Sequence, residues 1–299
     1  MEALLASPEE NKMGEMCGVN ASQDRGIVMR SACLFAAVVF WFGAAAAGDL
    51  RLDGPLTQGG LLRGVTEPGA EVVFDGHRVE VSTEGLFLVG FGRDDTGPFA
   101  LDVRHPDGTT THKNLAIKQR QYAIQRIDGL PPKMVTPDPA VLDRIRRENG
   151  WIAEVRARDT PEALFAGGFV WPVVGPISGV YGSQRILNGE PRRPHYGVDI
   201  AAPEGTPVRA PADGIVALAA NDLYYTGGTV MLDHGYGLTS VYSHMSAVTV
   251  SVGMRVARGD VIGRVGATGR VTGPHLDWRI NLFKTRLDPE LVVGPMPGQ

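Results

Sequence analysis

The chain contains 299 residues, a length that fits about two domains of roughly 150 residues each. Glycine (39 residues) and proline (21 residues) together form about a fifth of it, and 43% of the residues are hydrophobic. This composition fits turn-rich β structure and excludes a disordered chain, a collagen and a helical bundle. The net charge is −4 and no run of five or more basic residues occurs, so we expect no nucleic-acid partner.

The N-terminal segment has the pattern of an export signal. Residues 29–47 hold a basic start, an apolar run of about 11 residues and then a stretch of small residues, as in a secretory signal peptide. The apolar run is too short for a transmembrane helix, which needs about 20 residues. Residues 1–28 are polar and unpatterned, and we expect them to be a non-native extension before a start at Met29. We expect an exported protein, located in the periplasm or, as the alternative, outside the cell.

The two cysteines restrict the chemistry of the exported protein. Cys17 and Cys33 both lie in the segment that cleavage would remove. The remaining chain would then have neither a disulfide nor a thiol, which excludes a cysteine nucleophile and a cysteine-based zinc site.

Residues 48–118 are expected to form a small accessory domain. Short alternating stretches such as residues 70–74 and 86–91 are separated by turn signals, which favours an antiparallel, immunoglobulin-like β-sandwich. Its histidines, His77, His105 and His112, lie beside turns without the spacing of metal ligands, and we expect them to be exposed.

Residues 119–170 are expected to be a linker with one short helix. The Pro131-Pro132 pair is typical of linkers, and Asp138 can cap a helix that has Pro139 at its first position. We expect Gly150 to end this helix. From residue 171 to residue 290 the pattern is short strands separated by glycine turns, which predicts an all-β second domain, with residues 291–299 as a tail. The expected fold class is therefore mainly β.

A histidine and an aspartate four residues apart begin the second domain. On a straight strand, His195 and Asp199 would lie roughly 13 Å apart, too far for one metal ion. If both are ligands, the chain must bend between them, and Gly197 is the obvious place for the bend.

Further histidines and carboxylates follow on two later strands. Period-two alternation places His275, Asp277 and Arg279 on one face of a strand, opposite an apolar face, and His244 ends an earlier alternating strand. Histidine and aspartate from three strands, without cysteine, can build a catalytic zinc site with an open position for water.

Several motifs together give a specific resemblance. The stretch SGVYGSQRILNGEPRRPHYGVDIAAPEGTP (Ser178–Pro207), with LDHGYGLTSVYSHM and TGPHLDWRI, resembles the lysostaphin-type (LytM-like) zinc metallopeptidases that cut peptidoglycan peptides. The resemblance covers residues 171–289 and implies a lysostaphin-like all-β peptidase domain with one Zn²⁺ ion. It implies that His195 and Asp199 are the ligands of the H-x-x-x-D motif, and that His244 and His275 assist catalysis.

The motif departs from the family pattern at one ligand. Asp277 stands where the family has the second histidine of H-x-H, so the chain carries an HLDW variant of the motif. A carboxylate can reach the same point and bind zinc, which makes Asp277 the expected third ligand. One histidine and two aspartates would leave the zinc site formally neutral. We therefore expect a weaker Lewis acid that tolerates harder metals.

The sequence-based hypothesis is a zinc-dependent endopeptidase that hydrolyses peptide cross-links of bacterial peptidoglycan. Arg185, Asn188 and Tyr242 are expected to bind substrate, whereas His234, at a hairpin turn, is expected to be structural. The alternative function is a catalytically inactive regulator or activator that docks on cell-wall amidases. A lipoyl or biotinyl carrier needs a modifiable lysine in an exposed hairpin. The only lysine of this domain is Lys284, and we do not expect carrier function.

Overall fold

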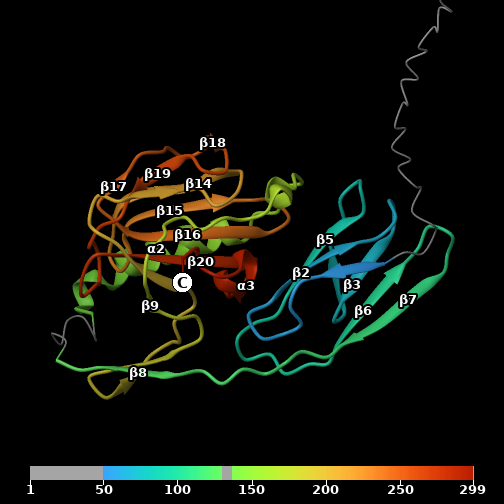
Figure 1. Cartoon of the computed structure of the whole chain (residues 1–299), viewed down its shortest axis with the longest axis horizontal. Helices are drawn as coiled ribbons and strands as arrows, with labels where there is room; N and C mark the ends of the chain where they lie inside the picture. The colour runs from blue at the N-terminus through green and yellow to red at the C-terminus, as the bar shows by residue number, and fades with distance from the viewer. Residues whose placement is uncertain (1–49, 130–136, 299) are drawn as a thin grey trace, which may run out of the picture. The chain divides into compact units, whose positions relative to one another are not determined.

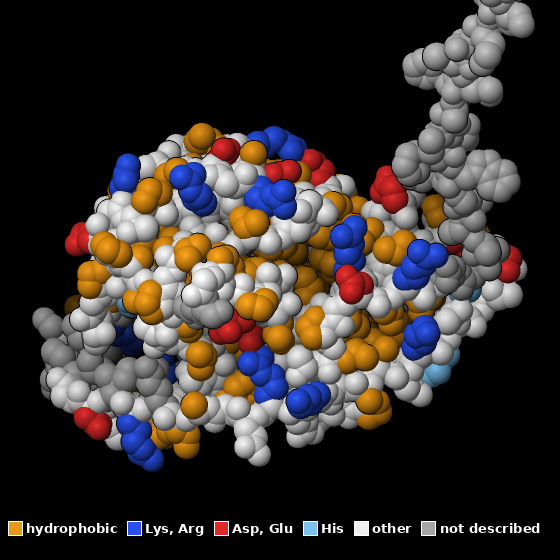
Figure 2. All heavy atoms as spheres, in the orientation of Figure 1, with side chains coloured by type: hydrophobic (Ala, Val, Ile, Leu, Met, Phe, Trp, Pro, Cys, Tyr) orange, Lys and Arg blue, Asp and Glu red, His pale blue; other side chains and the backbone are white. Residues whose placement is uncertain are grey.

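The computed structural model describes residues 50–129 and 137–298 (Figure 1). The predicted extension and signal peptide lie outside these residues. Within the described part, no helix combines the length and the apolar character needed to cross a bilayer. On the face drawn in Figure 2, the Lys and Arg side chains lie at separate points among apolar and acidic ones.

The first region, residues 50–118, forms two small antiparallel sheets. One has the order β1-β2-β5 and the other the order β4-β3-β6-β7. The strands are β1 (Arg51–Asp53), β2 (Leu61–Val65), β3 (Glu71–Phe74), β4 (His77–Val79), β5 (Leu86–Gly90), β6 (Phe99–Arg104) and β7 (Thr110–Leu115). Val72, Phe87 and Leu101 are buried in one core cluster together with residues of both sheets.

One histidine of this region differs from its prediction. His105 is 4% exposed, because its ring contacts Glu67 at 2.6 Å and Thr111 at 2.8 Å. His77 and His112 are exposed as expected.

The second region is built on one large sheet. Its order is β18-β14-β15-β16-β20-β12-β9, with β21 paired to β20, and a smaller sheet has the order β13-β19-β17. The strands are β9 (Ile177–Gly179), β12 (Val198–Ala201), β13 (Pro207–Arg209), β14 (Gly214–Leu223), β15 (Gly227–Asp233), β16 (Leu238–Met245), β17 (Ala247–Val248), β18 (Arg255–Val256), β19 (Val261–Arg264), β20 (His275–Leu282) and β21 (Thr285–Leu287).

The core of this region fixes the central strands. Val230 of β15, Tyr242 of β16 and Trp278 of β20 are fully buried in one cluster, and the Trp278 ring meets that of Trp171 at 5.5 Å. Because side chains alternate along a strand, Asp277 and Arg279, the neighbours of Trp278, point to the opposite face.

The predicted linker is largely structured. After a 3-10 turn η1 (Pro139–Val141), helix α2 (Leu142–Arg156) runs through Gly150, so the prediction that this glycine ends the helix is wrong. Val155 of α2 packs in a cluster with residues of β14, β15 and β16, and this tertiary contact outweighs the low helix propensity of glycine. A second 3-10 turn, η2 (Leu164–Gly167), precedes the large sheet.

Another part of the linker forms a strand. Residues of β8 (Ile124–Ile127) pair in parallel with β10 (Gln184–Leu187), which also pairs with β11 (Glu190–Pro191). The linker therefore covers one edge of the strand that carries Arg185.

The tail also packs on the domain. Asp288 caps helix α3 (Pro289–Val293) and pairs with Arg120 at 2.6 Å, and Met296 is only 5% exposed. Packing of the second region therefore extends beyond residue 290.

We expect Trp278→Ala to lower the free energy of unfolding by about 3–5 kcal/mol, because it empties a fully buried site between the sheet and Trp171. Chemical denaturation measures this change. The matched control is Trp151→Ala on α2, where the residue is 47% exposed and the loss should stay below about 1 kcal/mol. Equal losses for the two variants would contradict this description of the core.

Candidate metal centre

A row of residues crosses four neighbouring strands at one point of the large sheet. In register order these are Ser243 on β16, Asp277 on β20, Asp199 on β12 and Gly179 on β9. Residues directly opposite on antiparallel strands point to the same face. The pairing thus places two carboxylates side by side, although 78 residues separate Asp199 from Asp277 in the sequence.

His195 reaches this row because the chain bends before β12. The bend is at Gly197, as predicted, and it brings His195 Nε2 to 3.0 Å from Asp199 Oδ1 and 3.7 Å from Asp277 Oδ1. Apart from this mutual contact, both ring nitrogens of His195 and the Oδ1 atom of Asp199 are buried without a hydrogen-bond partner. Buried polar atoms are rarely left unpaired, so these atoms suit a bound cation.

The donor set fits a divalent metal ion. His195, Asp199 and Asp277 each offer one ligand atom, and all three atoms lie within 4.8 Å of one another. An imidazole nitrogen and two carboxylate oxygens are ligands that zinc accepts. Burial lowers the pKa of His195, but the two aspartates outweigh it and raise that pKa overall, so this point attracts positive charge.

Two arginines neutralise the two carboxylates. Arg185 on β10 donates from Nη2 to Asp199 Oδ2 at 2.8 Å. Arg279 donates from Nε to Asp277 Oδ1 at 2.8 Å and from Nη2 to Oδ2. Burial alone would raise the pKa of Asp277, but Arg279 and His195 hold it well below its usual range. Burial likewise raises the pKa of Asp199, and His195 and Arg185 together lower it overall.

Glycines make room for the acidic side chains. A Cβ atom on Gly179 would lie 2.3 Å from Asp199 Oδ2, and one on Gly197 would lie 2.9 Å from Asp277 Oδ1 and 2.5 Å from the Cγ atom of Arg279. No side chain fits at either position without moving a ligand.

A β-bulge turns His244 toward the site. Ser243 and His244 on β16 lie opposite the single residue Thr229 of β15, and His244 has a φ of +69°. Bulges re-aim side chains, and a non-glycine residue in this backbone region is strained. His244 Nδ1 donates to the Thr268 carbonyl at 2.9 Å, which leaves Nε2 facing Asp277 Oδ2 at 4.0 Å.

His275 presents the same nitrogen to the site. Its Nδ1 donates to the Gly273 carbonyl at 2.8 Å, and its Nε2 lies 3.8 Å from Asp199 Oδ1. The His244 and His275 rings are 4.9 Å apart. Because a carbonyl only accepts, each ring keeps its proton on Nδ1 and offers the lone pair of Nε2. Two potential proton acceptors therefore flank the cluster.

Comparisons with known proteins match this region. A profile of peptidase family M23 matches residues 193–289. A Pseudomonas aeruginosa protein, solved as a candidate peptidase M23, is 32% identical with a TM-score of 0.62 over 80% of this chain and 95% of its own. The chain belongs to peptidase family M23.

Two curated relatives of this M23 chain have named activities. It is 44% identical over 105 residues to the DD-carboxypeptidase/endopeptidase Mpg of Neisseria meningitidis, and 42% identical over 102 residues to the peptidoglycan DD-endopeptidase ShyA of Vibrio cholerae. These matches cover 35% and 31% of this chain but only 24% of each relative.

Five of the eight predicted site residues lie in the M23 site, and a sixth, Arg185, contacts one of them. His195, Asp199, Asp277, His244 and His275 converge. Arg185 donates to Asp199, and its predicted role in binding substrate stays a prediction. Asn188 is at the exposed turn between β10 and β11, where its role in binding substrate stays a prediction.

Tyr242 does not lie on this face of the M23 domain. It is paired with Trp278, is fully buried, and its hydroxyl bonds Ser240 at 2.7 Å. The prediction that it binds substrate is wrong, because period-two alternation points it into the core.

Two features of the M23 site were missed by sequence reasoning. Ser243 lies next to Asp277 with its hydroxyl buried and without a partner, and Arg279 pairs with Asp277. The spacing of Asp277 and Arg279 already placed them on one face, which was the available signal for the ion pair. The expectation of a formally neutral zinc site counted only the ion, His195, Asp199 and Asp277, and left out the charges of Arg185 and Arg279.

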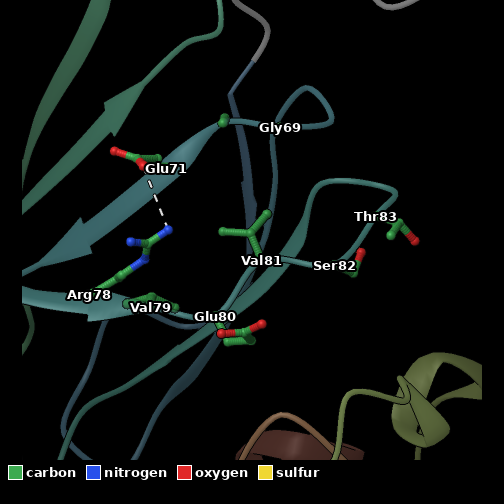
Figure 3. Close-up of a pocket in the computed structure, with 9 residues that line it drawn as sticks. Gly69, Glu71, Arg78, Val79, Glu80, Val81, Ser82 and Thr83 are labelled. Carbon is green, nitrogen blue, oxygen red and sulfur yellow. Dashed lines mark ion pairs between the residues drawn. The ribbon is translucent and has the colours of Figure 1, made fainter.

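A hollow in the first region has a different character (Figure 3). It is lined by residues 69–71 and 78–83, none of which is histidine or cysteine, and an exposed ion pair joins Arg78 and Glu71 at 3.6 Å. We assign no chemistry to it.

His234 has a structural environment, as predicted. Its Nδ1 contacts the Asp213 carbonyl and its Nε2 contacts Ser240 Oγ, both at 2.7 Å, and its ring packs against Phe169. Complete burial lowers its pKa to about 4.

This buried histidine predicts a pH-dependent stability. Because the pKa of His234 is lower in the folded than in the unfolded chain, protonation favours unfolding. The contribution of neutral His234 to the free energy of unfolding is complete above about pH 6.5. As the pH falls toward 4, up to about 3 kcal/mol of this free energy is lost. Denaturation of wild type and His234→Gln, with chelator present, should show a stability difference that narrows as the pH falls. His77→Gln, at an exposed position, is the control, and a constant difference for His234→Gln would refute the assignment.

Proposed function

We propose that this M23 chain is an exported, zinc-dependent endopeptidase that hydrolyses peptide cross-links of bacterial peptidoglycan. The observation that carries the proposal is the convergence of three ligand atoms with two histidines whose Nε2 lone pairs face them. The identity to Mpg and ShyA, over segments of about a hundred residues, supports peptidoglycan as the substrate.

Three residues would bind the metal ion and two histidines would transfer protons during hydrolysis. His195, Asp199 and Asp277 would hold the ion, which supplies Lewis acidity toward water and the scissile carbonyl when bound. Either His275 or His244 can take the proton of the attacking water at Nε2, because both rings keep Nδ1 protonated against a carbonyl. The protonated ring can then donate from Nε2 to the oxygen or nitrogen that gains charge as the peptide bond breaks.

The regulator alternative is not favoured. A regulator without metal has no use for ligands that converge, yet here the ligand atoms of His195, Asp199 and Asp277 do so. No observation supports a cell-wall amidase as partner.

Digestion of purified peptidoglycan, analysed by mass spectrometry, tests the activity. We expect peptide cleavage that a chelator abolishes, and a rate at least about a hundredfold lower for His275→Ala and for His244→Ala, since one of the two rings takes the proton of the water and the other is left to stabilise the oxyanion. His77→Ala, an exposed histidine of the first region, is the matched control. A protein with stoichiometric bound zinc that cleaves no peptide bond would contradict the proposal.

Export is proposed from the pattern of residues 29–47. Expression in a bacterium with two membranes should give a periplasmic protein whose N-terminus, read by mass spectrometry, follows residue 47. An intact N-terminal segment on a chain that stays in the cytoplasm would refute the export proposal.

A further inference from the structure

Arg279 makes an unusually complete contact with a metal ligand. Its guanidinium bonds both oxygens of Asp277, two residues earlier on the same face of β20. The Asp277 side chain is 2% exposed, so solvent contributes little to balancing its charge. An arginine that binds both carboxylate oxygens also fixes the plane of the carboxylate.

The pair occupies space that a side chain at position 197 would fill. A Cβ atom on Gly197 would lie within 3 Å of both Asp277 and Arg279, so the glycine at the bend creates the space that the pair fills. The same bend brings His195 to the site. The ion pair and the ligand geometry therefore depend on one backbone feature.

The pair still leaves Asp277 able to bind a cation. Each carboxylate oxygen has two lone pairs, and Arg279 uses one on each. Oδ1 remains 3.7 Å from His195 Nε2, and Oδ2 remains 4.0 Å from His244 Nε2. The negative charge of the Asp277 carboxylate and the positive charge of the Arg279 guanidinium cancel.

We infer that Arg279 is a positioning residue of the metal centre, and that Asp277 and Arg279 together act as one neutral ligand, equivalent in charge to a histidine. The inference rests on the metal site of the proposed function. It revises the expectation of a formally neutral zinc site, because the Asp277–Arg279 pair carries no net charge and the other ligand carboxylate, Asp199, is itself paired with Arg185.

The test compares the zinc affinity of Asp277→His with that of the double variant in which Arg279→Gln is added. The dissociation constant for zinc is measured on the full chain by competition with a chromophoric chelator, for Asp277→His alone and combined with Arg279→Gln. Asp277→His restores the usual family residue but leaves Arg279 unpaired beside the ion. We expect it to bind zinc at least about tenfold more weakly than the double variant.

Arg286 provides a matched control. It lies on β21, bonds Asn281 instead of a metal ligand, and is close enough to Arg279 to affect the same electrostatic environment. Combining Asp277→His with Arg286→Gln should leave the affinity within about threefold of Asp277→His alone. The inference is overturned if Asp277→His binds zinc as tightly as its double variant with Arg279→Gln, or if Arg286→Gln restores binding equally.

A second measurement does not need zinc. Chemical denaturation of the metal-free variants Asp277→Asn, Arg279→Gln and their combination forms a double-mutant cycle. We expect the combined loss of stability to be clearly smaller than the sum of the single losses, because each single change leaves the other member of the ion pair without its partner. Additive losses of stability would show that the two side chains do not interact and would overturn the inference. A wild-type chain that binds no zinc would instead contradict the proposed function, so the two failures are distinguishable.

Discussion

Two carboxylates that lie directly opposite each other on neighbouring strands set the main constraint on this structure. The pairing of β12 with β20 places Asp199 against Asp277, with ligand atoms no more than 4.8 Å apart. At that distance two unit charges repel by about 3 kcal/mol at an effective dielectric constant of about 20. Such a row persists only if positive charge surrounds it.

Three side chains supply that charge from several directions. Arg185 approaches Asp199 from β10, Arg279 approaches Asp277 from its own strand, and His195 reaches both from the bend at Gly197. A divalent ion would complete the compensation at a position where buried nitrogen and oxygen atoms of His195 and Asp199 lack hydrogen-bond partners. A cation at this position would therefore both balance the charge of the carboxylates and supply the Lewis acidity that hydrolysis needs.

Backbone conformation then orients the residues that move protons. The bulge at Ser243 and His244, with its left-handed φ at His244, turns one imidazole toward the ligands, and carbonyls of Thr268 and Gly273 fix the two tautomers. Strain of this kind is retained where the surrounding structure holds it, here by a core in which Tyr242 and Trp278 are fully buried.

The sequence by itself determined the strand-rich fold class and the bend at Gly197, because these follow from local alternation and from glycine. The five converging site residues were instead implied by the resemblance of their motifs to the lysostaphin-type family. Tertiary structure decided what depends on partners far along the chain. Helix α2 passes Gly150 because Val155 packs on the sheet, and Arg185 binds Asp199 because β8 and β11 hold β10 in place. Whether Arg279 was a solvated charge or half of a buried ion pair could not be read from its strand alone, since that depends on the room that Gly197 leaves on the neighbouring chain segment.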